Sequence, residues 1–162
     1  KLSIMIGGYV IEILNRNELP CAIKYVSLAI HPQYQTQKGY INNLTRGIIV
    51  KKVLENNTKG YKVHPQLYRF KNYKDPIYAI NGYLSEILEE AKRRNYYFDS
   101  NKIYVPKVRE IITVTAGQIN FEYRHFLKKL KNGIEKKYNE LKKLTKIGPN
   151  PIFKVIRGGV EN

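Results

Sequence analysis

The chain has 162 residues, of which 43% are hydrophobic, so it can bury one sizeable core, and a single domain is expected. Its 29 lysine and arginine residues outnumber 13 aspartate and glutamate residues, giving a net charge of +16. A field of this sign and size favours polyanionic partners over a merely basic soluble protein. The composition therefore predicts binding to nucleic acid, with DNA and RNA both open.

Cysteine and histidine are too sparse for a disulfide or metal scaffold. The chain has one cysteine, Cys21, which excludes an intramolecular disulfide and favours a reducing compartment or an organelle over secretion, with a virion as an alternative. The three histidines lie far apart in sequence, so we expect neither a metal nor another cofactor. No apolar run is long enough to span a bilayer, so no membrane partner is expected.

The first 26 residues differ from the rest of the chain in charge. They contain three basic and two acidic residues, so nearly all of the net charge lies beyond them. This shift predicts an apolar N-terminal extension over residues 1–26, followed by the main domain over residues 27–162. Alternation around Tyr9 to Leu14 suits a short strand or an irregular arm, and the extension offers a contact for other proteins.

Two helices are expected in the first half of the main domain. Residues 40–55 place Ile41, Leu44 and Ile48 on one face. Residues 58–75 are basic and aromatic, and are predicted to form a loop. Asp75-Pro76 then marks a helix start, with the carboxylate as N-cap, and apolar spacing continues to about Arg94. The carboxylates of this helix, Glu86, Glu89 and Glu90, are expected on its solvated side.

The second half predicts two further helices. Residues 115–118, Thr-Ala-Gly-Gln, fit a capping box that starts a helix ending near Asn132-Gly133. A last helix over residues 134–146 is expected to turn four apolar side chains inward: Ile134, Tyr138, Leu141 and Leu144. Residues 148–162 should be extended. The predicted fold is mainly α, a single compact helical domain of about four helices with extended N- and C-terminal segments.

Two long blocks resemble a known family. They run from Lys59 to Phe70 and from Asp75 to Asp99, and shorter matches extend the likeness from His31-Pro32-Gln33-Tyr34 to the segment 151–155. In these residues the chain resembles the pyrimidine-dimer DNA glycosylases, the small helical repair enzymes of the phage endonuclease V type. The shorter matches include residues 114–118, Glu122-Tyr123 and His125.

The resemblance implies a specific chemistry. Family members displace a nucleotide and attack the sugar with the α-amine of the chain terminus, and a glutamate on the first helix assists. A terminal amine with a pKa near ~7.7–8.0 is partly uncharged at neutral pH and therefore nucleophilic. The carboxylate acts as its acid–base partner and stabilises developing positive charge.

This chain departs from that pattern at both catalytic positions. The family's typical Trp-Arg-Glu-Gly corresponds to Leu44-Thr45-Arg46-Gly47, which places Arg46 at the glutamate position. The family terminus falls near Lys24 to Val26, which here lies mid-chain, without a free α-amine. An alternative is that Lys24 acts as the amine with a pKa lowered by burial, with Glu12 or Glu18 as the acid.

The residues and the resemblance together predict a catalytically inactive relative that binds nucleic acid, as a component of a ribonucleoprotein or DNA-packaging assembly. A working glycosylase and abasic-site lyase is the alternative, and a protein–protein scaffold is a third class. The expected nucleic-acid contacts are cations with a few rings for stacking. They are Arg46, Lys51, Lys52, Lys59, Tyr61, Lys62, His64, Arg69, Lys71, Lys74, Lys142 and Lys143, with Tyr68 and Tyr73 as further stacking candidates.

Overall fold

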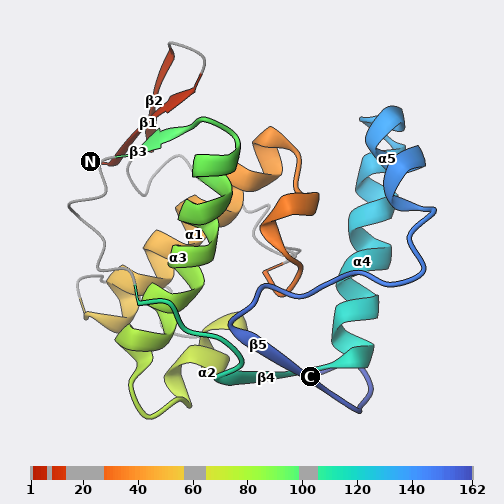
Figure 1. Ribbon diagram of the computed structural model, residues 1–162. Coiled ribbons are helices and arrows are strands. Elements are labelled where there is room, and N and C mark those ends of the chain that lie inside the picture. Colours follow the sequence, from red (N-terminus) through yellow and green to blue (C-terminus); the bar gives the residue numbers. More distant parts are fainter. Residues whose placement is uncertain (1, 7–8, 14–27, 57–64, 99–105, 162) are drawn as a thin grey trace.

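The computed structural model describes residues 2–6, 9–13, 28–56, 65–98 and 106–161 (Figure 1). Within these ranges the chain is mainly helical, which confirms the predicted fold class. The helices are α1 (Gln37–Leu54), α2 (Pro65–Lys71), α3 (Pro76–Arg93), α4 (Ala116–Lys131) and α5 (Glu135–Leu141), preceded by the short 3-10 helix η2 (Pro32–Tyr34).

The strands form two small sheets. β1 (Leu2–Ile6) and β2 (Tyr9–Ile13) pair antiparallel, and β1 also pairs antiparallel with β3 (Tyr97–Phe98) directly after α3. Of the two alternatives predicted around Tyr9, a short strand or an irregular arm, the strand is therefore the correct one. β4 (Ile112–Thr115) and β5 (Phe153–Ile156) pair in parallel, so part of the expected extended tail is a strand. Whether residues 1–26 behave as a separate unit stays a prediction.

The core forms where α1 packs on α3. Leu44 of α1 and Leu84 and Ile87 of α3 are fully buried, and the Tyr40 hydroxyl donates a 2.7 Å hydrogen bond to the Ile87 carbonyl. Gly47 permits this close approach, because a Cβ there would lie 2.6 Å from Cδ2 of Leu84. The two helices are thus locked by apolar packing and one buried hydrogen bond.

Three helix starts follow local cap chemistry. The Thr36 hydroxyl accepts the Gly39 N–H, so α1 begins three residues earlier than expected. Asp75 accepts the Tyr78 N–H at 3.0 Å, as predicted. Thr115 accepts the Gln118 N–H at 3.1 Å, which confirms half of the predicted capping box.

Two predictions about helical segments were wrong, one on the presence of a helix and one on the length of another. Residues 65–71 form helix α2 rather than a loop, because Leu67 and Phe70, three residues apart, bury one face of a helical turn among basic neighbours. The last helix ends at Leu141, not at 146. Because α5 spans only Glu135–Leu141, Ile134 lies before it and Leu144 after it. Both are exposed, whereas Leu141 is buried.

The expectation of solvated carboxylates on α3 was wrong for two of the three. Glu86 and Glu90 are buried, and only Glu89 remains near solvent, paired with Lys92. Glu90 accepts hydrogen bonds from Nε of Arg94 at 2.7 Å and from Nη1 of Arg93 at 2.9 Å. Burial raises the pKa of the Glu86 carboxyl, and nearby Arg109 opposes this. Cations on the same helix and on adjacent segments allow these acids to lie inside.

Candidate functional site

Helix α1 carries Arg46, at the position where the resemblance predicts a glutamate. Arg46 is half-buried there, and burial lowers the pKa of its guanidinium, an effect that the nearby Tyr83 hydroxyl opposes. On α4, burial and the charge of Arg46 lower the pKa of Lys129. The charge of Arg46 on α1 therefore acts on Lys129 of α4, and Tyr83 of α3 acts on Arg46.

The rest of α1 supplies no substitute acid. None of its 18 residues, Gln37–Leu54, is aspartate or glutamate. The next acid is Glu55, directly after the helix, which pairs with Lys51 at 3.9 Å. Lys52, the residue after Lys51, is exposed. This helix can attract an anion but cannot accept a proton through a carboxylate.

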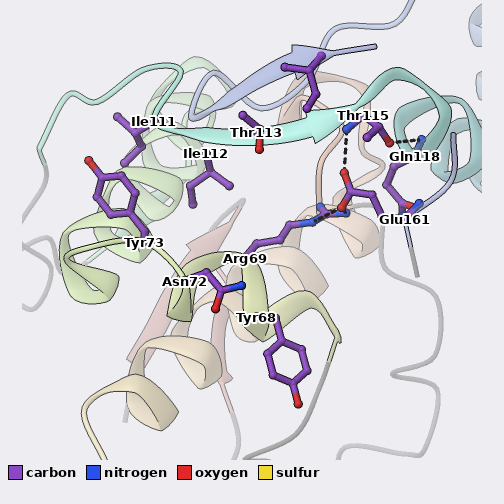
Figure 2. A pocket seen from close by; sticks show the side chains of 11 residues that line it. Tyr68, Arg69, Asn72, Tyr73, Ile111, Ile112, Thr113, Thr115, Gln118 and Glu161 are labelled. Atoms are coloured by element: carbon purple, nitrogen blue, oxygen red, sulfur yellow. Dashed lines mark hydrogen bonds and ion pairs between the residues drawn. The ribbon is translucent and has the colours of Figure 1, made fainter. Parts of the chain in front are cut away.

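Arg69 of α2 extends toward the carboxylate of Glu161 (Figure 2). Its Nε and Nη2 donate to Oε2 of Glu161 at 3.0 and 2.7 Å, and its Nη1 lies 4.0 Å from Oε1 of Glu122. The guanidinium also lies over the Phe153 ring, 5.8 Å from its centre. The arginine expected to contact phosphates is therefore engaged in an internal ion pair.

Glu122 of α4 is the most deeply buried member of this group, 4% exposed. It accepts the Ala29 N–H at 3.0 Å and the Gln118 side-chain N–H at 3.1 Å. Burial raises the pKa of its carboxyl, and the hydrogen bond from Gln118 and the charge of Arg69 oppose that rise. The carboxylate thus joins α4 to the chain before η2.

A cavity of about 630 Å³ lies beside Arg69. Tyr68, Asn72 and Tyr73, on or just after α2, line one side, and β4 lines the other with Glu161 at one end (Figure 2). This volume lies in the usual range of small-molecule sites, and the lining mixes rings, amides and charges.

A comparison with protein families decides the relationship. The family model for pyrimidine dimer DNA glycosylases matches residues 14–104, more than half of the chain. The chain belongs to this family. No curated protein and no solved structure was found to match it.

The family match divides the group around Arg69. Helices α1, α2 and α3 lie within the matched residues, whereas Glu122 and Glu161 lie beyond them. The sequence reasoning did not assign either glutamate to a site. The burial of Glu122 could have been predicted, since it falls between Ile119 and Phe126 on the apolar face of α4, where an acid needs a partner. The contacts of Glu161 could not, because its partners are distant in sequence.

The other predicted contacts of this family member form separate groups. Lys71 and Lys74 are exposed near α2, whereas Lys142 and Lys143 are exposed directly after α5. Figure 1 shows α2 and α5 far apart. Five further predicted residues lie outside the described residues: Lys24, Lys59, Tyr61, Lys62 and His64. In the part that the structure describes, the cations are thus distributed over several faces.

The described ranges contain neither a metal-ligand cluster nor a membrane-spanning helix. No three His, Cys, Asp or Glu side chains in residues 2–6, 9–13, 28–56, 65–98 and 106–161 gather as metal ligands would. No helix within those ranges has the length and apolarity needed to cross a membrane.

Proposed function

We propose that this family member binds DNA without carrying out the glycosylase and lyase reactions. The observation that carries the proposal is the absence of any carboxylate on α1, the helix on which the family resemblance requires a glutamate. A Schiff-base lyase needs both an uncharged amine and an acid–base partner. Here Arg46 supplies a cation instead, and 23 residues precede Lys24 in the sequence.

The same substitution favours binding. The charge of Arg46 lowers the pKa of Lys129, so an anion placed near the two side chains would relieve the repulsion between them. The family match favours DNA over RNA as the partner. We infer that the protein acts as a fixed component of a nucleic-acid assembly, and the preference for DNA favours a DNA-packaging particle over a ribonucleoprotein.

Salt dependence tests the binding half of the proposal. Each neutralised phosphate should add about −0.9 to the slope of log affinity against log salt on duplex DNA. We expect a steep slope that depends little on sequence, measured by fluorescence anisotropy with two unrelated duplexes. A flat titration between low and physiological salt would remove the electrostatic basis of the proposal.

Borohydride trapping on abasic DNA tests the catalytic half. Reduction fixes a Schiff base as a covalent adduct, so an active lyase is detected by its retarded band on a denaturing gel. We expect no adduct and no strand cleavage with the full chain, beside an active family enzyme as positive control. An adduct would show that the protein is an enzyme.

A working glycosylase and abasic-site lyase is the second candidate, and Glu122 favours it. A buried carboxyl with a raised pKa suits a general acid, and this one bonds to Ala29, five residues after Lys24. If this candidate is correct, Lys24→Met abolishes the trapped adduct, and Glu122→Gln slows strand cleavage. Both variants leave the adduct and cleavage at background if the protein is inactive.

A further inference from the structure

The start of α4 is completed by a residue from the far end of the chain. A full capping box would return the Gln118 side chain to the Thr115 N–H. Instead, the Thr115 N–H donates to Oε1 of Glu161 at 2.7 Å. The Gln118 side chain contacts Glu122 and accepts the Glu161 N–H at 3.1 Å. A carboxylate therefore occupies the position of the expected cap.

Three N–H donors hold that carboxylate. Besides Thr115, Arg69 donates Nε and Nη2 to the other oxygen, at 3.0 and 2.7 Å (Figure 2). A guanidinium fork combined with the N-terminus of a 16-residue helix is a receptor for an oxyanion. Nη1 of Arg69 is buried and makes no hydrogen bond, and it lies 4.0 Å from Oε1 of Glu122. An anion with more oxygens than a carboxylate would find that additional donor.

The segment that brings Glu161 to this position is held mainly by polar contacts with the start of α4, among them the hydrogen bond that the Thr115 hydroxyl donates to the Gly159 carbonyl. Gly158 accepts the Gly117 N–H at 2.9 Å, and the approach is so close that a Cβ on Gly117 would lie 2.3 Å from the backbone of Gly159. Val160 is 50% exposed, and Gly158 and Gly159 have no side chain to bury. A segment held by a few polar contacts and little apolar area opens at low free-energy cost.

We propose that the start of α4 is a phosphate-binding site and that Glu161 is an internal ligand which competes for it. A singly charged phosphodiester matches the carboxylate in charge and adds oxygens for Nη1 of Arg69. The inference deepens the proposed function and rests on it for the source of the phosphate, a DNA backbone. Exchange of one anion for another leaves the buried Glu122 facing the same total charge.

The test compares two full-length variants that each lose one negative charge. Glu161→Gln places an amide against the donors and releases the site, whereas Glu110→Gln removes an exposed carboxylate elsewhere. For Glu161→Gln we expect duplex affinity to rise at least about fivefold, the lower end of ordinary coupling between sites. One added phosphate contact should also steepen the salt slope by about 0.9.

Addition of Arg69→Gln to Glu161→Gln should cancel both gains. Glu110→Gln should leave the salt slope unchanged. If Glu110→Gln and Glu161→Gln raise affinity alike, with the same slope, the effect is general charge removal and the proposed site is wrong.

A second measurement separates this site from the proposed function and from loss of folding. In a nitrogen-15 spectrum, inorganic phosphate at mildly acidic pH should shift the Thr115 amide of Glu161→Gln saturably, and that of the wild type more weakly. If no variant binds duplex but this shift appears, the site stands and the proposed function fails. If the Thr115 amide does not respond in either protein, the site is refuted. Where the variant is unstable, the wild type is titrated to phosphate concentrations that compete with Glu161, and an unshifted amide there refutes the site.

Discussion

Two arginines, Arg94 and Arg69, each hold a carboxylate, but the surroundings of the two pairs differ. Arg94 at the end of α3 donates to Glu90, four residues earlier, and its Nη2 also donates to the carbonyl of Gln35 at 2.8 Å. It lies over the Tyr40 ring at 5.2 Å. Arg69 pairs with Glu161, 92 residues away, and keeps one buried donor without a hydrogen bond.

The difference separates a structural clamp from an exchangeable contact. Glu90 and Arg94 are fixed near each other by one helix, so little entropy is lost in pairing them. The pairing of Arg69 with Glu161 requires the whole segment after β5 to be ordered. A cavity beside Arg69 also gives another anion access. The first pair should therefore determine stability, and the second should respond to ligands.

Loss of the clamp should have the largest effect on stability. Arg94→Met would leave Glu90 buried with a weaker partner and free the carbonyls of the segment before α1. Breaking one side of a buried ion pair typically costs ~3–5 kcal/mol. We expect a loss of that order in the free energy of unfolding, measured with urea.

Arg93→Met is the matched control, because Arg93 also pairs with Glu90 but its side chain is 54% exposed. An exposed pair contributes ~0–1 kcal/mol. Equal losses in the two variants would mean that Arg94 is no clamp.

Displacement of the C-terminal segment should have a smaller effect on stability and a larger one on binding. Gly117→Ala introduces a Cβ 2.3 Å from the Gly159 backbone, which cannot yield as a flexible side chain would. We expect a loss of ~1–3 kcal/mol from the steric conflict, together with the rise in duplex affinity proposed for Glu161→Gln. Calorimetry and anisotropy measure the two effects.

Gly133→Ala controls for the substitution itself, since a Cβ there would meet its nearest atom only at 3.9 Å. If Gly117→Ala lowers stability while affinity stays at the wild-type value, the segment is structural and does not compete with DNA.

The buried carboxyl of Glu122 on α4, close to Arg69, should influence the pH dependence of stability. Burial raises the pKa of Glu122, so the folded protein keeps a proton that the unfolded chain has already lost. Its contribution to the free energy of unfolding therefore increases as pH falls through the raised pKa, and levels off below the ordinary value near ~4.3. Relative to Glu122→Gln, the wild type should gain stability from pH 7 toward that value.

Glu89 supplies a control of opposite sign. Its hydrogen bond from Lys92 lowers its pKa, so its contribution is present at neutral pH and is lost as pH falls through the lowered value. Relative to Glu89→Gln, the wild type should lose stability on acidification. Parallel trends for the two variants would contradict the assigned direction for Glu122.

Sequence patterns predicted the contacts made within a few residues and failed for those made across the chain. Asp75 and Thr115 cap helices through donors three residues away, so a short motif contains both partners. The burial of Glu90 depends partly on Arg94, which also holds carbonyls about sixty positions earlier. The replacement of the capping box by Glu161 spans 46 positions. No local pattern contains these partners, and only the folded chain brings them together.

The smallest expected effect lies on the clamp side of the comparison, at His31. Nδ1 of His31 accepts the Gln33 N–H at 3.1 Å and so caps η2, whose Pro32 carbonyl Arg94 holds. Burial and the charge of Arg93 lower the pKa of His31. Its contribution to stability is therefore complete above the ordinary value near ~6.5 and declines as pH falls through the lowered pKa, because protonation removes the acceptor.

His31→Asn keeps an acceptor but does not titrate, so the wild type should lose stability relative to this variant between neutral and mildly acidic pH. Urea unfolding at several pH values measures the difference. Identical pH profiles for the two proteins would show that the cap has no influence on the clamp, and the stability of that region would then depend on Arg94 and Glu90 without it.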